Sequence, residues 1–98
     1  SDVYKRQLVY NADNIRRSVE EVCKGGKAFS IVLTVYVPEH GFILLDNLSI
    51  KAVYKGSLVY NVKVSYRSTV ERIGRGYHVI RISRSWEEGE LPVISLKY

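Results

Sequence analysis

The residues of this chain best suited to bind a ligand are basic side chains on segments in which apolar and polar residues alternate. Five of them fall at positions expected to face outward from strands: Lys51, Lys55, Lys63, Arg67 and Arg81. If those strands are neighbours, the cations form one stripe, and with Tyr77 or Trp86 nearby to stack on bases it could bind single-stranded nucleic acid. The interpretation that we favour is that outward and edge lysines keep a sheet soluble and block edge-to-edge pairing.

Patterns typical of enzymes and metal sites are weak in this sequence. The histidines, His40 and His78, have no second histidine or carboxylate at ligand spacing, so a metal site is not supported. Ser30, His40 and Asp46 could be assembled into a nucleophile–base–acid set, but chance offers such triples in any serine-rich domain. Cys23 is the single cysteine and is expected to be a small core residue. We therefore expect no enzyme, no cofactor and no small-molecule substrate.

Length and composition limit the kind of domain that can position these residues. Ninety-eight residues make one domain, and 46% of them are hydrophobic, which is normal for a globular chain. The net charge of +5 permits weak attraction to anionic surfaces or nucleic acid. The absence of methionine and the scarcity of glutamine and cysteine are typical of proteins from hot environments, so we expect a thermophilic microbe.

The first seven residues, SDVYKRQ, fit no periodic pattern with the residues after them. The codons TCA GAT GTG TAT AAG AGA CAG spell them, and these codons are also the end of a transposon adapter used in sequencing libraries. We predict that residues 1–7 are adapter-derived and that the natural sequence begins at Leu8. Residues 8–98 would then be a single domain, and a fragment of a longer protein, so a missing signal peptide carries no meaning.

A helix is predicted at about 12–24. Asn11 can cap its first turn, and Gly25 and Gly26 end it. Its apolar residues lie at i, i+4, i+7 and i+8, which gives one buried stripe: Ile15, Val19, Val22 and Cys23.

From residue 29 onward the hydrophobic period changes to two, which predicts strands. The first strand should bury Phe29, Ile31, Leu33, Val35 and Val37. FILL is a short strand, and Asp46–Asn47 turns the chain into a hairpin over residues 48–67, with a two-residue turn at Gly56–Ser57. The hairpin should bury Leu48, Ile50, Ala52 and Tyr54 on one strand, and Leu58, Tyr60, Val62, Val64 and Tyr66 on the other.

The remaining segments complete the pattern. STVERIGRG is predicted to be a loop or single turn, and YHVIRISRS a strand that turns His78, Ile80 and Ile82 to one face. VISLKY closes the chain with Ile94, Leu96 and Tyr98 on one side. The fold class is mainly β: an antiparallel β-sandwich of the fibronectin-III or immunoglobulin kind with one N-terminal helix. The alternative is an α+β fold with a single helix packed on an antiparallel sheet. Strands this close leave no room for helical crossovers, which excludes a parallel sheet.

The stretch IVLTVYVPEHGFILLDNLSIKAVYKGSLVYNVKV resembles the LEA14/WHy domain, the late-embryogenesis-abundant group 2 fold. The likeness rests on the turn at Tyr36-Val37-Pro38, on the segment 43–48 and on the hairpin at 54–59, and it covers about residues 29–66. Val37 stands where the family has asparagine, and the helix is not a family feature. The resemblance implies a sandwich of about seven strands without catalytic residues.

Two functions of different classes are expected from these observations. The first is a non-enzymatic structural or interaction module that packs against a protein partner or a neighbouring domain of the same chain. The alternative is a basic β-sheet domain that binds single-stranded nucleic acid through the five cations. A third hypothesis, an enzyme fragment whose active site lies on missing sequence, has the least support.

Overall fold

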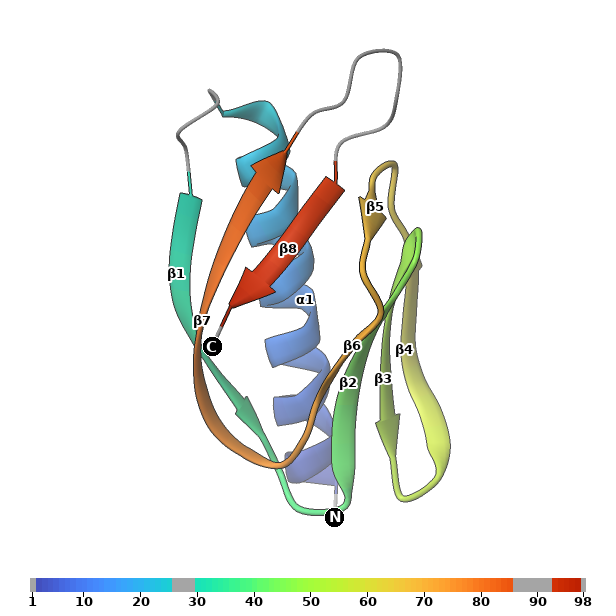
Figure 1. Ribbon diagram of the computed structural model, residues 1–98. Coiled ribbons are helices and arrows are strands. Elements are labelled where there is room, and N and C mark those ends of the chain that lie inside the picture. Colours follow the sequence, from blue (N-terminus) through green and yellow to red (C-terminus); the bar gives the residue numbers. More distant parts are fainter. Residues whose placement is uncertain (1, 26–29, 86–92, 98) are drawn as a thin grey trace.

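The computed structural model describes residues 2–25, 30–85 and 93–97, which form one helix and eight strands (Figure 1). The helix is α1 (Asp2–Lys24). The strands are β1 (Ser30–Val37), β2 (Gly41–Asp46), β3 (Ser49–Tyr54), β4 (Ser57–Lys63), β5 (Arg67–Ser68), β6 (Glu71–Ile73), β7 (Gly76–Ser85) and β8 (Val93–Lys97). The predicted residues Gly26, Phe29, Trp86 and Tyr98 lie outside the described part.

The strands form a sandwich of two four-stranded sheets, so the chain is mainly β as predicted. Sheet A has the strand order β1-β7-β8-β5, and sheet B has the order β4-β3-β2-β6. Neighbouring strands pair antiparallel except β5 and β8, which pair parallel at Arg67↔Val93 and Ser68↔Ile94. Both sheets are therefore antiparallel as predicted, apart from this two-residue pair, and the chain between β5 and β8 runs through β6 and β7, which gives the long connection that a parallel pair needs.

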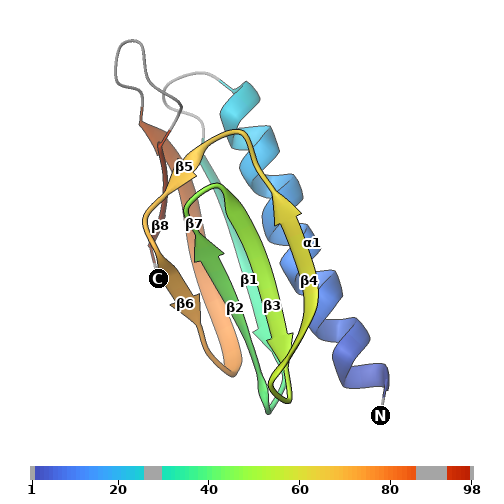
Figure 2. The ribbon, with the colours of Figure 1, turned by 90° about the vertical axis from the view of Figure 1, so that its right-hand side faces the viewer.

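α1 lies along one side of the sandwich, where it contacts strands of both sheets (Figure 2). It ends at Lys24 as predicted, but the predicted start at about 12 is wrong, because the helix begins at Asp2. Asn11 lies within the helix and does not cap it. Its Nδ2 donates to the carbonyl of Gln7 at 2.8 Å, and its Oδ1 accepts the N–H of Tyr36 at 2.9 Å. Asn11 therefore satisfies a backbone donor of β1, an edge strand of sheet A.

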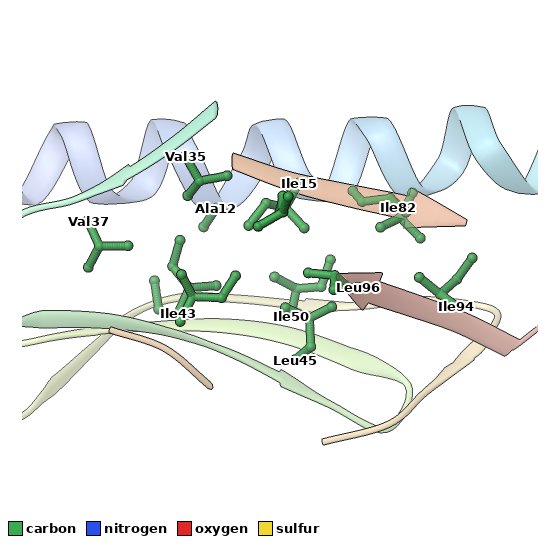
Figure 3. Packing of buried hydrophobic residues seen from close by; sticks show 14 of the residues in the cluster. Ala12, Ile15, Val35, Val37, Ile43, Leu45, Ile50, Ile82, Ile94 and Leu96 are labelled. Atoms are coloured by element: carbon green, nitrogen blue, oxygen red, sulfur yellow. The ribbon is translucent and has the colours of Figure 1, made fainter. Parts of the chain in front are cut away.

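One aliphatic core fills the space between α1 and the two sheets (Figure 3). The helix contributes the stripe Leu8, Ala12, Ile15, Val19 and Val22. The strands contribute mainly Val35, Val37, Ile43, Leu45, Ile50, Ala52, Ile73, Ile80, Ile82, Ile94 and Leu96. Complete burial of one such leucine, isoleucine or valine stabilises the fold by roughly 1.5–3 kcal/mol. The apolar residues of the helix and those of the strands thus form a single core.

The alternation predicted for β1 and β7 is confirmed. Val35 and Val37 are buried, whereas Val32 on the opposite parity is 53% exposed. On β7, Ile80 and Ile82 are buried and Tyr77 is 77% exposed. The antiparallel register pairs Val35 with His78 and Val37 with Gly76, which brings the inward faces of the two strands together.

The β3–β4 hairpin differs from the prediction at its turn. Lys55 and Gly56 are the central residues, with φ values of 50° and 79°, and Ser57 already pairs with Tyr54. Positive φ at both positions is the type I′ geometry that matches the twist of paired strands. The register then shifts between Ala52 and Val53, because Ala52 faces Tyr60 whereas Val53 faces Leu58.

This β-bulge at Val59 explains one incorrect inward prediction. One extra residue in β4 reverses the side to which Leu58 points, so Leu58 is 54% exposed while Tyr60 keeps its inward parity. The predicted burial of Leu48 is also wrong. Leu48 is 38% exposed, because it lies in the β2–β3 turn with a φ of 68°.

The segment predicted to be a loop, residues 68–76, contains β6 and the second residue of β5, and β5 takes its first residue, Arg67, from the end of the predicted hairpin. Both strands are too short to show a period. β6 continues the sheet by pairing with β2, and after Gly74 and Arg75 the chain enters β7, which pairs with β1. β1 likewise enters β2 after residues 38–40. The paired ribbon β1/β7 of sheet A therefore bends into the ribbon β2/β6 of sheet B and joins the two sheets at one end (Figure 1).

Candidate functional site

Sheet B carries three of the five predicted cations. Ile50 and Ala52 of β3 point into the core, so Lys51 between them points outward. Lys63 of β4 is exposed and lies opposite Ser49, which shares the outward parity of Lys51. Lys55 lies at the turn between these strands and is exposed. Lys51 and Lys63 therefore share one sheet face, and Lys55 lies at the end of that sheet.

A fourth cation, Arg72 of β6, joins this face together with an apolar row. The register places Lys51 and Arg72 on the two sides of Leu44. One step along the strands, Phe42 lies opposite Val53, and Val53 lies opposite Leu58. We call this surface the basic face and define it by seven residues: Phe42, Leu44, Lys51, Val53, Leu58, Lys63 and Arg72.

Two side-chain interactions order the cations of the basic face. The guanidinium carbon of Arg72 lies 4.3 Å from the ring centroid of Phe42, a cation–π contact. Lys51 Nζ lies 3.1 Å from Asp46 Oδ2, and the two side chains are 31% and 42% exposed. Such a half-exposed pair contributes at most about 1 kcal/mol. Among the outward-facing residues described for sheet B, Asp46 is the one carboxylate, so the face has a positive potential.

The other two predicted cations lie on sheet A. Arg81 of β7 is exposed on the outer face, opposite Val32 of β1, and Arg67 belongs to β5. The five cations therefore do not form one stripe, because β5 and β7 are not neighbours of β3 and β4. Tyr77 also lies on sheet A, where its ring centroid is 4.7 Å from that of Tyr36. The aromatic pair and the basic face thus lie on opposite outer faces of the sandwich.

The histidines, Cys23 and Ser30 lie outside the basic face. His78 Nε2 lies 2.7 Å from the carbonyl oxygen of Gly74, so this ring nitrogen has a hydrogen-bond partner. Cys23 is half-buried, and burial raises the pKa of its thiol. Ser30 and His40 lie at the start and beyond the end of β1, so the proposed triad is not assembled. Among residues 2–25, 30–85 and 93–97, no three His, Cys, Asp or Glu side chains gather to hold a metal ion.

A hydrogen-bonded cluster fixes α1 against sheet B. Asp13 Oδ1 accepts from Arg16 Nε at 2.8 Å and from the Tyr60 hydroxyl at 2.9 Å. The hydrogen bond from Arg16 is the main cause that lowers the pKa of Asp13, with help from Tyr60 and Arg17 and against partial burial. Burial, followed by the bond to Asp13, raises the pKa of Tyr60 to about 12. The cluster anchors β4, which carries Lys63 and Leu58, to the helix.

Sequence reasoning missed Arg72 and Phe42. Arg72 falls in the segment predicted to be a loop, where no periodic pattern assigns a face. Phe42 belongs to the predicted strand FILL, whose two faces the prediction does not distinguish. The alternation within GFILLD was the available signal, because Ile43 and Leu45 are buried while Phe42 and Leu44 are half-buried.

Comparisons of the chain with protein-family models, with curated proteins and with solved structures gave no match. The resemblance to the LEA14/WHy domain therefore stays a prediction. Within the described residues, no helix is both long enough and apolar enough to cross a membrane.

Proposed function

We propose that the chain is a non-enzymatic interaction module whose basic face binds an acidic, partly apolar surface of a protein partner or of a neighbouring domain. One observation carries the proposal: Lys51, Lys63 and Arg72 lie around an apolar row on one face of sheet B. Protein interfaces combine an apolar centre with a polar rim, and arginine and aromatic residues are enriched in them. The resemblance to LEA14/WHy domains implies the same class of function.

The arrangement favours a protein partner over single-stranded nucleic acid. Non-specific binding of single strands combines a cationic groove with aromatic rings on which bases stack. On the basic face the single aromatic ring, Phe42, already has the Arg72 guanidinium over it. The exposed Tyr77 lies on the other sheet with Arg81. Phosphates could still contact the lysines, but the seven residues of the basic face include no second ring on which a base could stack.

A peptide selection tests the proposed partner chemistry. The full chain would be used to select from a displayed library of random peptides, and the bound peptides would be sequenced and their affinities measured. We expect enrichment of aspartate or glutamate next to large apolar residues. The double variant Lys63→Glu/Arg72→Glu should weaken these peptides at least about tenfold, because it reverses two charges of the face. Arg81→Glu reverses a charge that is likewise exposed, on sheet A, and should leave affinity unchanged.

Two results would contradict the proposal. One is a selection without acidic peptides, or with peptides that bind the double variant as well as the original chain. The other is binding of a fluorescent oligonucleotide at micromolar affinity or better near about 0.15 M salt, with a steep loss as salt rises. The second result would establish the nucleic-acid alternative in its place.

A further inference from the structure

A second candidate site lies at the end of the sandwich where β1 passes into β2. A cavity of about 360 Å³ opens there, between that connection and the β3–β4 turn. Its lining residues are Tyr4, Tyr36, Glu39, His40, Tyr54 and Lys55. Tyr4 belongs to the predicted adapter segment, so the inference rests on the other five.

The two turns that frame the cavity are tied to each other. The backbone N–H of Lys55 donates to the carbonyl of His40 at 2.8 Å. His40 and Lys55 both have positive φ, 69° and 50°, a conformation that non-glycine residues rarely adopt. Gly41 N also donates to the carbonyl of Pro38 at 3.1 Å, which closes the first turn. These bonds hold Glu39, His40 and Lys55 around the opening before any ligand arrives.

Tyrosine rings form the apolar walls of the cavity. Tyr36 and Tyr54 are half-buried, so each has a ring partly covered by the fold and partly open. Tyr36 packs against Tyr77, which is 77% exposed and lies outside the cavity lining, with the two ring planes tilted by 37°. A tyrosine offers an apolar ring and a hydroxyl that both donates and accepts. Such walls suit a ligand with one apolar face and a hydroxylated edge.

The charges at the opening are balanced, which argues against an ionic ligand. Glu39 Oε1 lies 3.8 Å from Arg75 Nη1, and both side chains are largely exposed. Lys55 Nζ lies 5.4 Å from the ring centroid of Tyr54, where it would repel a cationic ligand. Glu39 would in turn repel an anionic one. The site nevertheless offers donors from Lys55 and the tyrosines and acceptors from Glu39.

We propose that this cavity binds a pyranose sugar ring. One face of a pyranose consists of C–H groups that pack on a tyrosine, and its hydroxyls both donate and accept hydrogen bonds without net charge. Glycoside hydrolysis uses a pair of carboxyl groups on the two sides of the bond. Of the described residues that line the cavity, Glu39 is the one carboxylate. The described lining therefore lacks the pair of carboxyl groups that hydrolysis of this kind uses.

An NMR titration of the full chain tests the proposal. Glucose, galactose and N-acetylglucosamine would be added in turn to ¹⁵N-labelled protein. At least one should shift the amide signals of residues 36–41 and 54–56 with a dissociation constant in roughly the millimolar range, as expected for so small a ligand. Tetramethylammonium chloride and adenosine monophosphate are the charged probes. Binding of either in preference to every sugar, or no binding of any sugar, would overturn the proposal.

Single substitutions locate the binding. Tyr54→Ala and Glu39→Gln should each weaken the sugar by several-fold or more, and Glu39 is exposed enough for its variant to keep the fold. Tyr10→Ala removes a 63% exposed tyrosine from α1 outside the cavity and should change nothing. If Tyr4→Ala alone abolished binding while Tyr54→Ala did not, the proposal would be wrong. The Lys63→Glu/Arg72→Glu variant should bind sugar normally, which separates this site from the basic face.

Discussion

The first turns of α1 differ sharply in burial, and this predicts what happens when residues 1–7 are removed. Every side chain from Asp2 to Gln7 is exposed, whereas Leu8 is completely buried. Deletion of residues 1–7 removes the exposed helical positions 2–7 and the bond from Asn11 to the Gln7 carbonyl, but no residue of positions 2–7 is buried. We therefore expect the free energy of unfolding to change by no more than about 1 kcal/mol.

The substitution Leu8→Ala is the matched comparison, because it leaves the length unchanged and removes core atoms. Truncation of a buried leucine costs about 2–5 kcal/mol through lost burial and the cavity left behind. Leu8 packs close to β2: a Cβ added to Gly41 would lie 3.1 Å from Leu8 Cδ2. For a domain of this size such a loss lowers Tm by about 10–30 °C.

Urea unfolding followed by circular dichroism would compare three proteins: the full chain, residues 8–98 and the full chain with Leu8→Ala. We expect nearly coincident unfolding curves for the first two proteins and a transition at lower urea concentration for the third. If residues 8–98 were as unstable as Leu8→Ala, residues 2–7 would be required by the fold, and the adapter interpretation would lose its support. A cost below about 1 kcal/mol for Leu8→Ala would contradict the burial of Leu8.

Three other tests address single contacts of the fold, and a fourth addresses the thiol. The pKa of Asp13 is lowered in the fold, so its ionised form stabilises the fold above about pH 4, and this contribution is lost as the pH falls further. The urea midpoint of the Asp13→Asn variant should therefore fall less between neutral and acid pH than the midpoint of the original chain. Tyr60→Phe removes the hydrogen bond to Asp13 and should lower the free energy of unfolding by about 1 kcal/mol at neutral pH in the same assay. Gly56→Ala should lower the free energy of unfolding by about 1–2 kcal/mol, because alanine is strained at a φ of 79°. The added Cβ would have no neighbouring atom within 4 Å, so no clash adds to this strain. Equal thermal midpoints of the variant and the original chain would contradict this prediction. Because burial raises the pKa of Cys23, its thiol should react with Ellman's reagent slowly in the native protein and faster in urea.

The periodic parts of the sequence predicted the fold well. The in/out rhythm of β1 and β7 needs no information beyond the residues themselves, since Val35, Val37, Ile80 and Ile82 alternate with polar or exposed neighbours. The predictions failed at residues whose contacts with distant parts of the chain override their local sequence preference. Asn11 has the side chain of a good helix cap, but it uses its oxygen on the N–H of Tyr36, a residue that only the fold brings near.

The candidate site was predicted only in part. Lys51 and Lys63 were placed correctly on neighbouring strands, because their hairpin is local in sequence. The sheet to which Arg81 belongs depends on the bend of the β1/β7 ribbon, which no local pattern reports. Arg72 was missed because a three-residue strand is too short to show a period. The bulge at Val59 likewise moved Leu58 from the expected core to the basic face.

The position of β8 has a consequence for biosynthesis. It comes after every other described strand in the sequence, yet it lies inside sheet A, between β7 and β5. A growing polypeptide can close the β3–β4 hairpin early, but residues 81–85 of β7 have no β8 to pair with until residues 93–97 leave the ribosome. During that interval the open side could recruit a strand from another nascent copy. Chains that terminate prematurely before β8 should therefore accumulate as aggregates.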